Sequence, residues 1–140
     1  MSNQTAIFVV RAVLGFCFLM HGLQSVLPYK WLGGMTHRAF SAFLRRGGVP
    51  WHDFAAHVVP WAEVVAGVAL LVGFAHRFSA GVVIVLMLGA VMFFHRSGYF
   101  MPGGMEYPVA LISMAVLVFA AGPGAFAFEV DVRQNQGRRN

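Results

Sequence analysis

The sequence predicts an all-α integral membrane protein, a four-helix bundle with one further amphipathic helix at the membrane interface. The first observation is composition: 59% of the 140 residues are hydrophobic, only 11% are charged, and the mean hydropathy is +0.70. A soluble domain with a solvated surface does not reach these values. The second is the grouping of apolar residues into four runs, residues 6–27, 54–74, 78–94 and 107–123. At about 1.5 Å per helical residue, such runs extend roughly 25 to 33 Å, enough to cross a hydrocarbon core of about 30 Å.

The first run, residues 6–27, is interpreted as a retained helix rather than a signal peptide. No Lys or Arg precedes Arg11, and the run is longer than the apolar region of a typical signal peptide. Cys17 is the single cysteine of the chain, so no intramolecular disulfide can form. This excludes the membrane thiol oxidoreductases that depend on a CxxC motif.

The net charge of +5 comes from basic residues at the ends of the runs and in the tail. Such residues set topology and contact anionic lipid, so we expect the lipid bilayer as a partner and exclude nucleic acid. Four spans place both termini on one side, but basic residues occur on both sides, and the positive-inside rule does not decide the orientation. We expect residues 1–128 to form one membrane domain and residues 129–140 a polar tail that is disordered at its end.

The connection between the first two runs, residues 28–52, predicts an amphipathic helix lying in the interface. Paired glycines, Gly33-Gly34 and Gly47-Gly48, bracket it. Its apolar residues share one helical stripe: Met35, Ala39, Phe40, Phe43 and Leu44. This helix either covers a pocket that opens from the membrane or anchors the bundle to the lipid surface, and we favour the anchor.

Glu63, in the middle of the second run, is the main candidate for a functional residue. An ionisable group at the bilayer centre costs roughly 2.5–3.5 kcal/mol on insertion scales, and such residues usually belong to functional sites. Pro60 lies three residues earlier, where it frees a backbone carbonyl and so favours a hydrated cavity.

Arg11 and His21, both in the first run, are the predicted partners of Glu63. At about 100° per residue they share one sector of the helix with Gly15 and Gly22, and small residues there allow a neighbouring helix to approach closely. Antiparallel packing places the Cα levels of His21 and Glu63 within roughly 5 Å, with Arg11 about 9 Å away along the membrane normal. We therefore expect Glu63, His21 and Arg11 to form the catalytic group of any active site.

Four more polar residues are expected at the face opposite the termini, where they would bind a substrate or quinone: Gln24, His57, His95 and Glu106. A haem held between His21 and His95 is disfavoured, because no second histidine pair lies at suitable levels and no known haem spacing is present. No metal site is expected, because the histidines lack H-x-x-x-H or Cys/His spacing.

Two interpretations of the Arg11, His21 and Glu63 group stay open. In the first it is a structural network that fixes helix register. In the second it binds the headgroup of a quinone: His21 or Arg11 donates a hydrogen bond to a carbonyl, and Glu63 passes protons.

The chain resembles the DoxX family of small bacterial membrane proteins over nearly its whole length. The matching positions are Arg11, His21-Gly22-x-Gln24, Glu63 with Gly67, Gly73-x-x-His76-Arg77, His95, Glu106, and Gly122-Pro123-Gly124 followed by residues 126–131. One position departs from the pattern: the family often has a basic residue directly after the His-Gly-x-Gln stretch, and here it is Ser25.

The resemblance implies a four-helix bundle in the bacterial cytoplasmic membrane with both termini in the cytoplasm. It also implies kinship with the membrane subunit of thiosulfate:quinone oxidoreductases. We therefore expect a subunit or membrane anchor of a quinone-linked oxidoreductase, with quinone as the ligand, other oxidoreductase subunits as partners, and a homo-oligomer as a further option. The alternative is a non-enzymatic scaffold, or a small transport or proton-conducting bundle.

Overall fold

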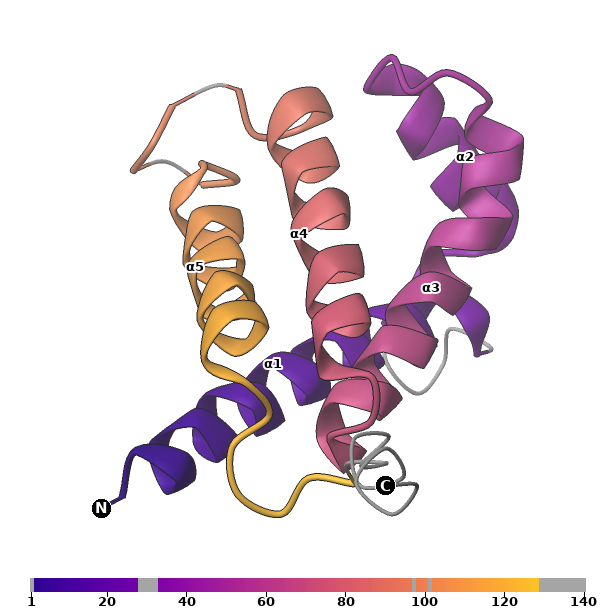
Figure 1. Ribbon diagram of the computed structural model, residues 1–140. Helices are drawn as coiled ribbons and strands as arrows, with labels where there is room; N and C mark the ends of the chain where they lie inside the picture. Colours follow the sequence, from indigo (N-terminus) through magenta and orange to yellow (C-terminus); the bar gives the residue numbers. More distant parts are fainter. Residues whose placement is uncertain (1, 28–32, 97, 101, 129–140) are drawn as a thin grey trace, which may run out of the picture.

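The computed structural model describes residues 2–27, 33–96, 98–100 and 102–128, so the predicted polar tail lies outside the described residues. This part of the chain forms five α-helices and no strand (Figure 1). The helices are α1 (Asn3–Val26), α2 (His37–Arg46), α3 (His52–Val72), α4 (His76–Phe93) and α5 (Glu106–Ala121). The predicted all-helical fold is confirmed.

Within the described ranges, α1, α3 and α4 are long and apolar enough to cross a membrane. α5 is apolar too, but its 16 residues extend only about 24 Å. α5 ends at Ala121 because Gly122 adopts a φ of 97°, a conformation open to glycine and strained for other residues. Large apolar side chains are exposed along the helices, among them Trp61, Val65 and Val85, as expected where lipid is the solvent.

The closest helix pair is α1 with α3, and glycine makes this approach possible. A Cβ atom on Gly15 would lie 2.9 Å from the carbonyl oxygen of Gly67, and one on Gly22 would lie 2.6 Å from that of Pro60. Real Cβ atoms are essentially never found so close to another heavy atom. The prediction that Gly15 and Gly22 admit a neighbouring helix is therefore confirmed.

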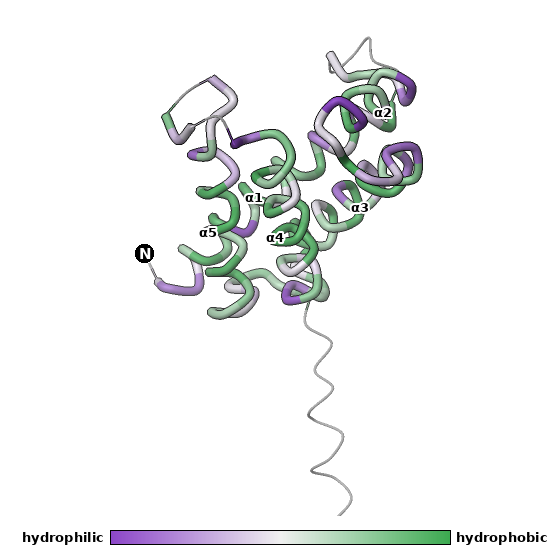
Figure 2. The backbone as a smooth tube through the Cα atoms, turned by 90° about the horizontal axis from the view of Figure 1, so that it is seen from above, coloured by the Kyte–Doolittle hydropathy of each residue, from purple (hydrophilic) through white to green (hydrophobic). Residues whose placement is uncertain are grey.

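The other long helices complete the bundle. α4 and α5 lie side by side, α3 packs on α4, and α1 packs on α5 (Figure 1). The core where they meet takes side chains from all four: Leu14 and Phe18, Ala66 and Leu70, Ala80 and Val83, and Leu111, Ala115 and Val118. Hydrophobic residues run along α4 and α5, whereas hydrophilic ones gather towards α2 and the ends of the helices (Figure 2).

The predicted amphipathic helix is present as α2, and it packs on α3. Its first turn is capped by Thr36, whose side-chain oxygen accepts a hydrogen bond from the backbone N–H of Ala39. Ser41 and Leu44 are buried, while Arg38, Arg45 and Arg46 are exposed. In the bundle, α2 lies beyond α3, at the edge away from α5 (Figure 1).

Replacing Gly22 by alanine is expected to destabilise the bundle by about 1–3 kcal/mol, because the added methyl group collides with the backbone of α3 at Pro60. Gly81 in α4 is the matched control, since a Cβ there meets nothing within 4 Å. Gly81→Ala is expected to leave stability unchanged or to raise it by about 0.5–1 kcal/mol. Unfolding by SDS, followed by circular dichroism, compares the two; equal stabilities would contradict the proposed helix contact.

Candidate functional site

A half-open pocket of about 340 Å³ lies in the half of the bundle next to α2, and all five helices contribute to its wall. Most of the lining is apolar, and much of it is aromatic. The lining residues include Phe18, Phe40, Phe43, Val59, Phe93, Phe94 and Leu111. Four lining side chains carry polar atoms, His21, Glu63, His95 and Tyr107. An apolar cavity with a few polar groups is the usual form of a small-molecule site.

Glu63 and His21 line the same pocket because α1 and α3 are in close contact. Within the described part of the chain, no hydrogen bond or ion pair involves Glu63. A carboxyl group that borders an apolar cavity without such a partner is available to a ligand or to a proton.

Tyr107, from the first turn of α5, is a pocket residue that the sequence analysis did not identify. Its hydroxyl group lies 3.5 Å from Nε2 of His21, at the limit of a hydrogen bond, and within electrostatic reach of Glu63. The sequence predicts its neighbour Glu106 as a site residue instead, and the side chain of Glu106 does not line the pocket. Tyrosine at the end of a membrane span is the one signal that pointed to it.

His95 follows the C-cap of α4 and lies at the pocket wall. Its Nδ1 atom is 2.6 Å from the carbonyl oxygen of Gly103. Because a carbonyl oxygen only accepts, Nδ1 carries the hydrogen and donates it. When the ring is neutral, its Nε2 atom keeps a lone pair and can accept a hydrogen bond from a molecule in the pocket.

Arg11 is completely buried but does not line the pocket. Its Nη2 atom donates to the carbonyl oxygens of Ala125 and Phe126, at 3.0 and 3.3 Å, and the guanidinium group lies 5.5 Å from the ring centroid of Phe8. Gly73 packs directly against the guanidinium group, where a side chain would collide with it. Arg11 therefore joins α1 to the segment after α5 and to the α3–α4 turn.

The structure thus separates Arg11 from the Glu63 pocket. Arg11 and His21 are ten positions apart in α1, a rise of roughly 15 Å. Backbone carbonyl groups after the end of α5 lie within reach at the level of Arg11 and accept its hydrogen bonds.

The other predicted residues also lie outside the pocket lining. His57 contacts α2 instead. It lies six residues before Glu63, which is about 240° around the helix after one full turn, so the two side chains are on different faces of α3. Glu106 has a buried Oε2 atom without a hydrogen-bond partner among the described residues. Gln24 lies near the end of α1, outside the lining. Of the predicted site residues, the structure brings Glu63, His21 and His95 together.

Replacing Arg11 by methionine is expected to lower the free energy of unfolding by about 1.5–3 kcal/mol, the usual worth of hydrogen bonds to a charged group. Arg77, exposed at the same end of the bundle, is the matched control, and Arg77→Met is expected to change stability by less than about 0.5 kcal/mol. SDS unfolding checks both. A stable Arg11→Met variant would show that these contacts are not structural.

A comparison with protein families agrees with this architecture. The family model described as DoxX matches residues 6–96, more than half of the chain, and the matched range runs from α1 to just past α4. It includes the pocket residues His21, Glu63 and His95, whereas α5 lies beyond it. No curated protein and no solved structure matches the chain. With its long apolar helices, the chain is a membrane protein that belongs to the DoxX family.

Proposed function

We propose that this protein binds a quinone in the pocket beside Glu63 and serves as the membrane subunit, or the membrane anchor, of a quinone-linked oxidoreductase. The pocket is the observation that carries the proposal. Its aromatic and aliphatic walls suit a flat apolar ring, and its polar side chains suit the oxygens of that ring.

The polar side chains supply complementary functions. Tyr107 and His21 carry groups able to donate a hydrogen bond to a quinone oxygen, and Glu63 can give up or take up a proton. Reduction of a quinone to a quinol consumes two electrons and two protons. In this proposal the electrons come from a partner oxidoreductase subunit, and Glu63 and His21 pass the protons.

The aromatic side chains of α2 and α4 hold the ring. Phe43 of α2 stacks on Phe94 at the end of α4, with the ring centroids 4.4 Å apart, and both line the pocket beside Phe40. An apolar wall of this kind disfavours water beside the ring, so that the polar side chains of the pocket are the groups that pass protons to it.

We place the protein in the bacterial cytoplasmic membrane with both termini in the cytoplasm. The start of α1 and the segment after α5 lie at one end of the bundle, where the backbone N–H of Ala125 donates to the carbonyl oxygen of Gln4 at 2.9 Å. The pocket and α2 then belong to the half of the membrane that faces away from the cytoplasm.

The alternative functions need different features. A transporter or proton conductor needs a polar path between the two ends of the bundle. Between the pocket and the end that holds Arg11, the described core is apolar and closed, with Leu14, Leu70 and Val118 fully buried. This arrangement favours a pocket over a channel, and a scaffold would need neither.

Glu63→Gln is expected to weaken quinone binding about tenfold, because the amide presents different hydrogen-bonding groups to the quinone from those of the carboxyl group. Protein purified in mild detergent is extracted and its lipids are identified by mass spectrometry, and a short-chain quinone is titrated by calorimetry. Glu106→Gln makes the same change outside the pocket lining and is expected to keep the affinity. If no quinone is retained and Glu63→Gln binds as well as the parent protein, the oxidoreductase proposal fails.

The orientation is tested in a Cys17→Ser background with one new cysteine at exposed Asn3 or exposed Ala39, at opposite ends of the bundle. A maleimide that cannot cross the cytoplasmic membrane is added to cells whose outer barrier has been permeabilised. We expect it to label Ala39→Cys and to spare Asn3→Cys until the membrane is lysed. The reverse pattern would place the termini outside the cytoplasm.

A further inference from the structure

One end of the Glu63 pocket is closed by contacts between α2 and α4. Phe43 of α2 stacks on Phe94 at the end of α4. Gly47, which follows α2 directly, packs on the same ring, since a Cβ atom there would lie 2.3 Å from a ring carbon of Phe94. Leu44 of α2 is buried in the pocket wall. The ends of α2 and α4 are therefore packed tightly against each other at this end of the pocket.

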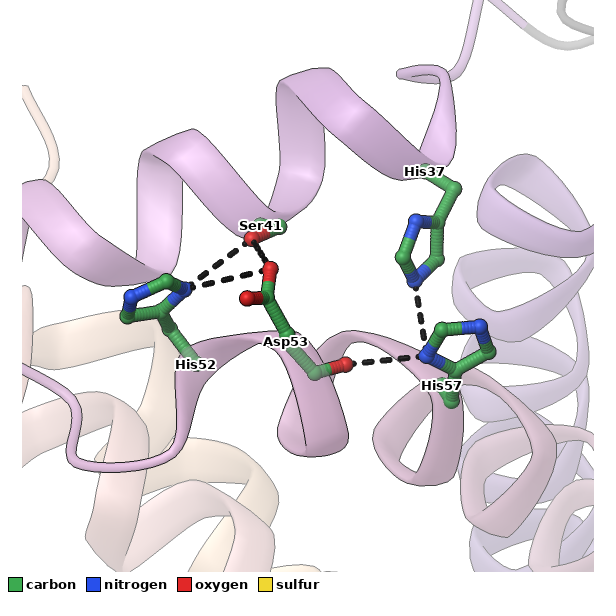
Figure 3. Close-up of polar contacts among 5 residues, drawn as sticks. All are labelled: His37, Ser41, His52, Asp53 and His57. Carbon is green, nitrogen blue, oxygen red and sulfur yellow. Dashed lines mark hydrogen bonds and ion pairs between the residues drawn. The ribbon is translucent and has the colours of Figure 1, made fainter.

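Polar contacts with α3 hold the rest of α2 in place (Figure 3). At the start of α2, Nε2 of His37 lies 2.9 Å from Nδ1 of His57. At its middle, the hydroxyl group of Ser41 donates a hydrogen bond to the carboxylate of Asp53, and Nδ1 of His52 lies 3.0 Å from the Ser41 oxygen. α2 is thus attached at its start, its middle and its end, and this arrangement favours a ligand path that does not pass α2.

The pocket also reaches the lipid-facing side of α4. Val85 lines the pocket, although 68% of this residue is exposed. Gly89, one helical turn further along α4, lines the pocket as well, and a Cβ atom on it would meet nothing within 4 Å. A lining residue that is mostly exposed lies at the rim of a pocket. Val85 and Gly89 therefore mark an opening, called here the α4 opening.

The depth of the α4 opening places it at the hydrocarbon core of the membrane. α4 has 18 residues and is about 27 Å long, and Val85 and Gly89 lie roughly 14 and 20 Å from its first residue. Leu88, between them and Ala90, is apolar and half exposed. An opening at this depth admits molecules that are dissolved in the bilayer, because lipid chains and not water surround it.

The size and polarity of the pocket suit one part of such a molecule. Its volume of about 340 Å³ is near the lower end of the range for small-molecule sites, about 300–1,000 Å³, so it has room for a ring system but not for a long chain as well. The polar groups of His21 and Tyr107 come from α1 and α5, whereas the α4 lining from Val85 to Ala90 is apolar. A ligand with a polar ring and a long apolar chain fits both features.

We propose that the pocket takes a quinone with a long isoprenoid chain, that this quinone enters sideways from the bilayer, and that its chain passes out through the α4 opening at Gly89. The inference rests on the proposed function and adds to it the class of quinone and the residue that admits the chain. Glycine leaves this path free because it has no side chain, and a larger residue at position 89 obstructs it.

Gly89→Leu obstructs the opening without a clash with the protein, since its Cβ atom meets nothing within 4 Å. Two quinones with the same dimethoxy-methyl ring, one without a chain and one with a decyl chain, are titrated by calorimetry in one mild detergent. We expect the affinity for the decyl quinone, relative to that for the chainless quinone, to fall about tenfold in Gly89→Leu. Gly81→Leu makes the same change in α4 outside the pocket lining and is expected to keep the parent ratio.

The route of the chain is observed directly with a decyl quinone whose chain ends in a photoreactive diazirine. After illumination, the cross-linked peptide of the parent protein is identified by mass spectrometry. We expect cross-links in α4, around Val85 and Leu88. Cross-links confined to α1 or α5 would show that the chain leaves elsewhere.

The outcomes separate this inference from the proposed function. If the parent protein binds the chainless quinone but Gly89→Leu keeps the parent ratio, or Gly81→Leu lowers it equally, the α4 opening is not the path and the proposed function stands. If the parent protein binds neither quinone, the proposed function fails, and the inference fails with it.

Discussion

The close contact of α1 with α3 is the constraint on which the rest of this structure depends. Lipid tails are as apolar as the side chains of a membrane helix, so helices gain little from hydrophobic burial and associate mainly through tight packing. Gly15 and Gly22 allow the two backbones to approach to a distance that no larger residue would permit. The same approach brings His21 of α1 and Glu63 of α3 to the wall of one pocket.

Arg11 and Glu63 show two different outcomes for a charged residue in an apolar span. Arg11 contacts the chain segment that follows α5, where two backbone carbonyl groups accept hydrogen bonds from its Nη2 atom, while its Nε and Nη1 atoms have no partner among the described residues. Glu63 borders a cavity, and no hydrogen bond or ion pair joins its carboxyl group to another described residue. The first arrangement stabilises the fold. The second costs free energy, because a carboxyl group lies beside an apolar cavity without a partner, and a bound ligand or a proton would offset that cost. This difference is the reason for assigning a structural role to Arg11 and a binding role to Glu63.

Some features of the site can be predicted from the sequence, and others cannot. The nearly equal depth of His21 and Glu63 follows from the helical rise and the antiparallel order of the helices. The direction of the Arg11 side chain does not, because a long side chain can reach acceptors on several neighbouring helices. The choice between Glu106 and Tyr107 is similar: adjacent residues differ by about 100° around a helix, and only the rotation of α5 in the bundle selects Tyr107 for the pocket.

The sequence by itself determined that this is a helical membrane protein and where its apolar helices lie. It also determined which glycine-lined face of the first helix contacts a neighbouring helix. These features follow from composition, periodicity and residue size, which are properties of each segment alone. The tertiary structure decided that α2 forms one wall of the pocket, that Arg11 binds the segment after α5, and that His37 meets His57. These contacts join residues that are between about 20 and 115 positions apart in the chain. Their geometry depends on how whole helices are rotated and shifted against one another, and no local pattern encodes that rotation.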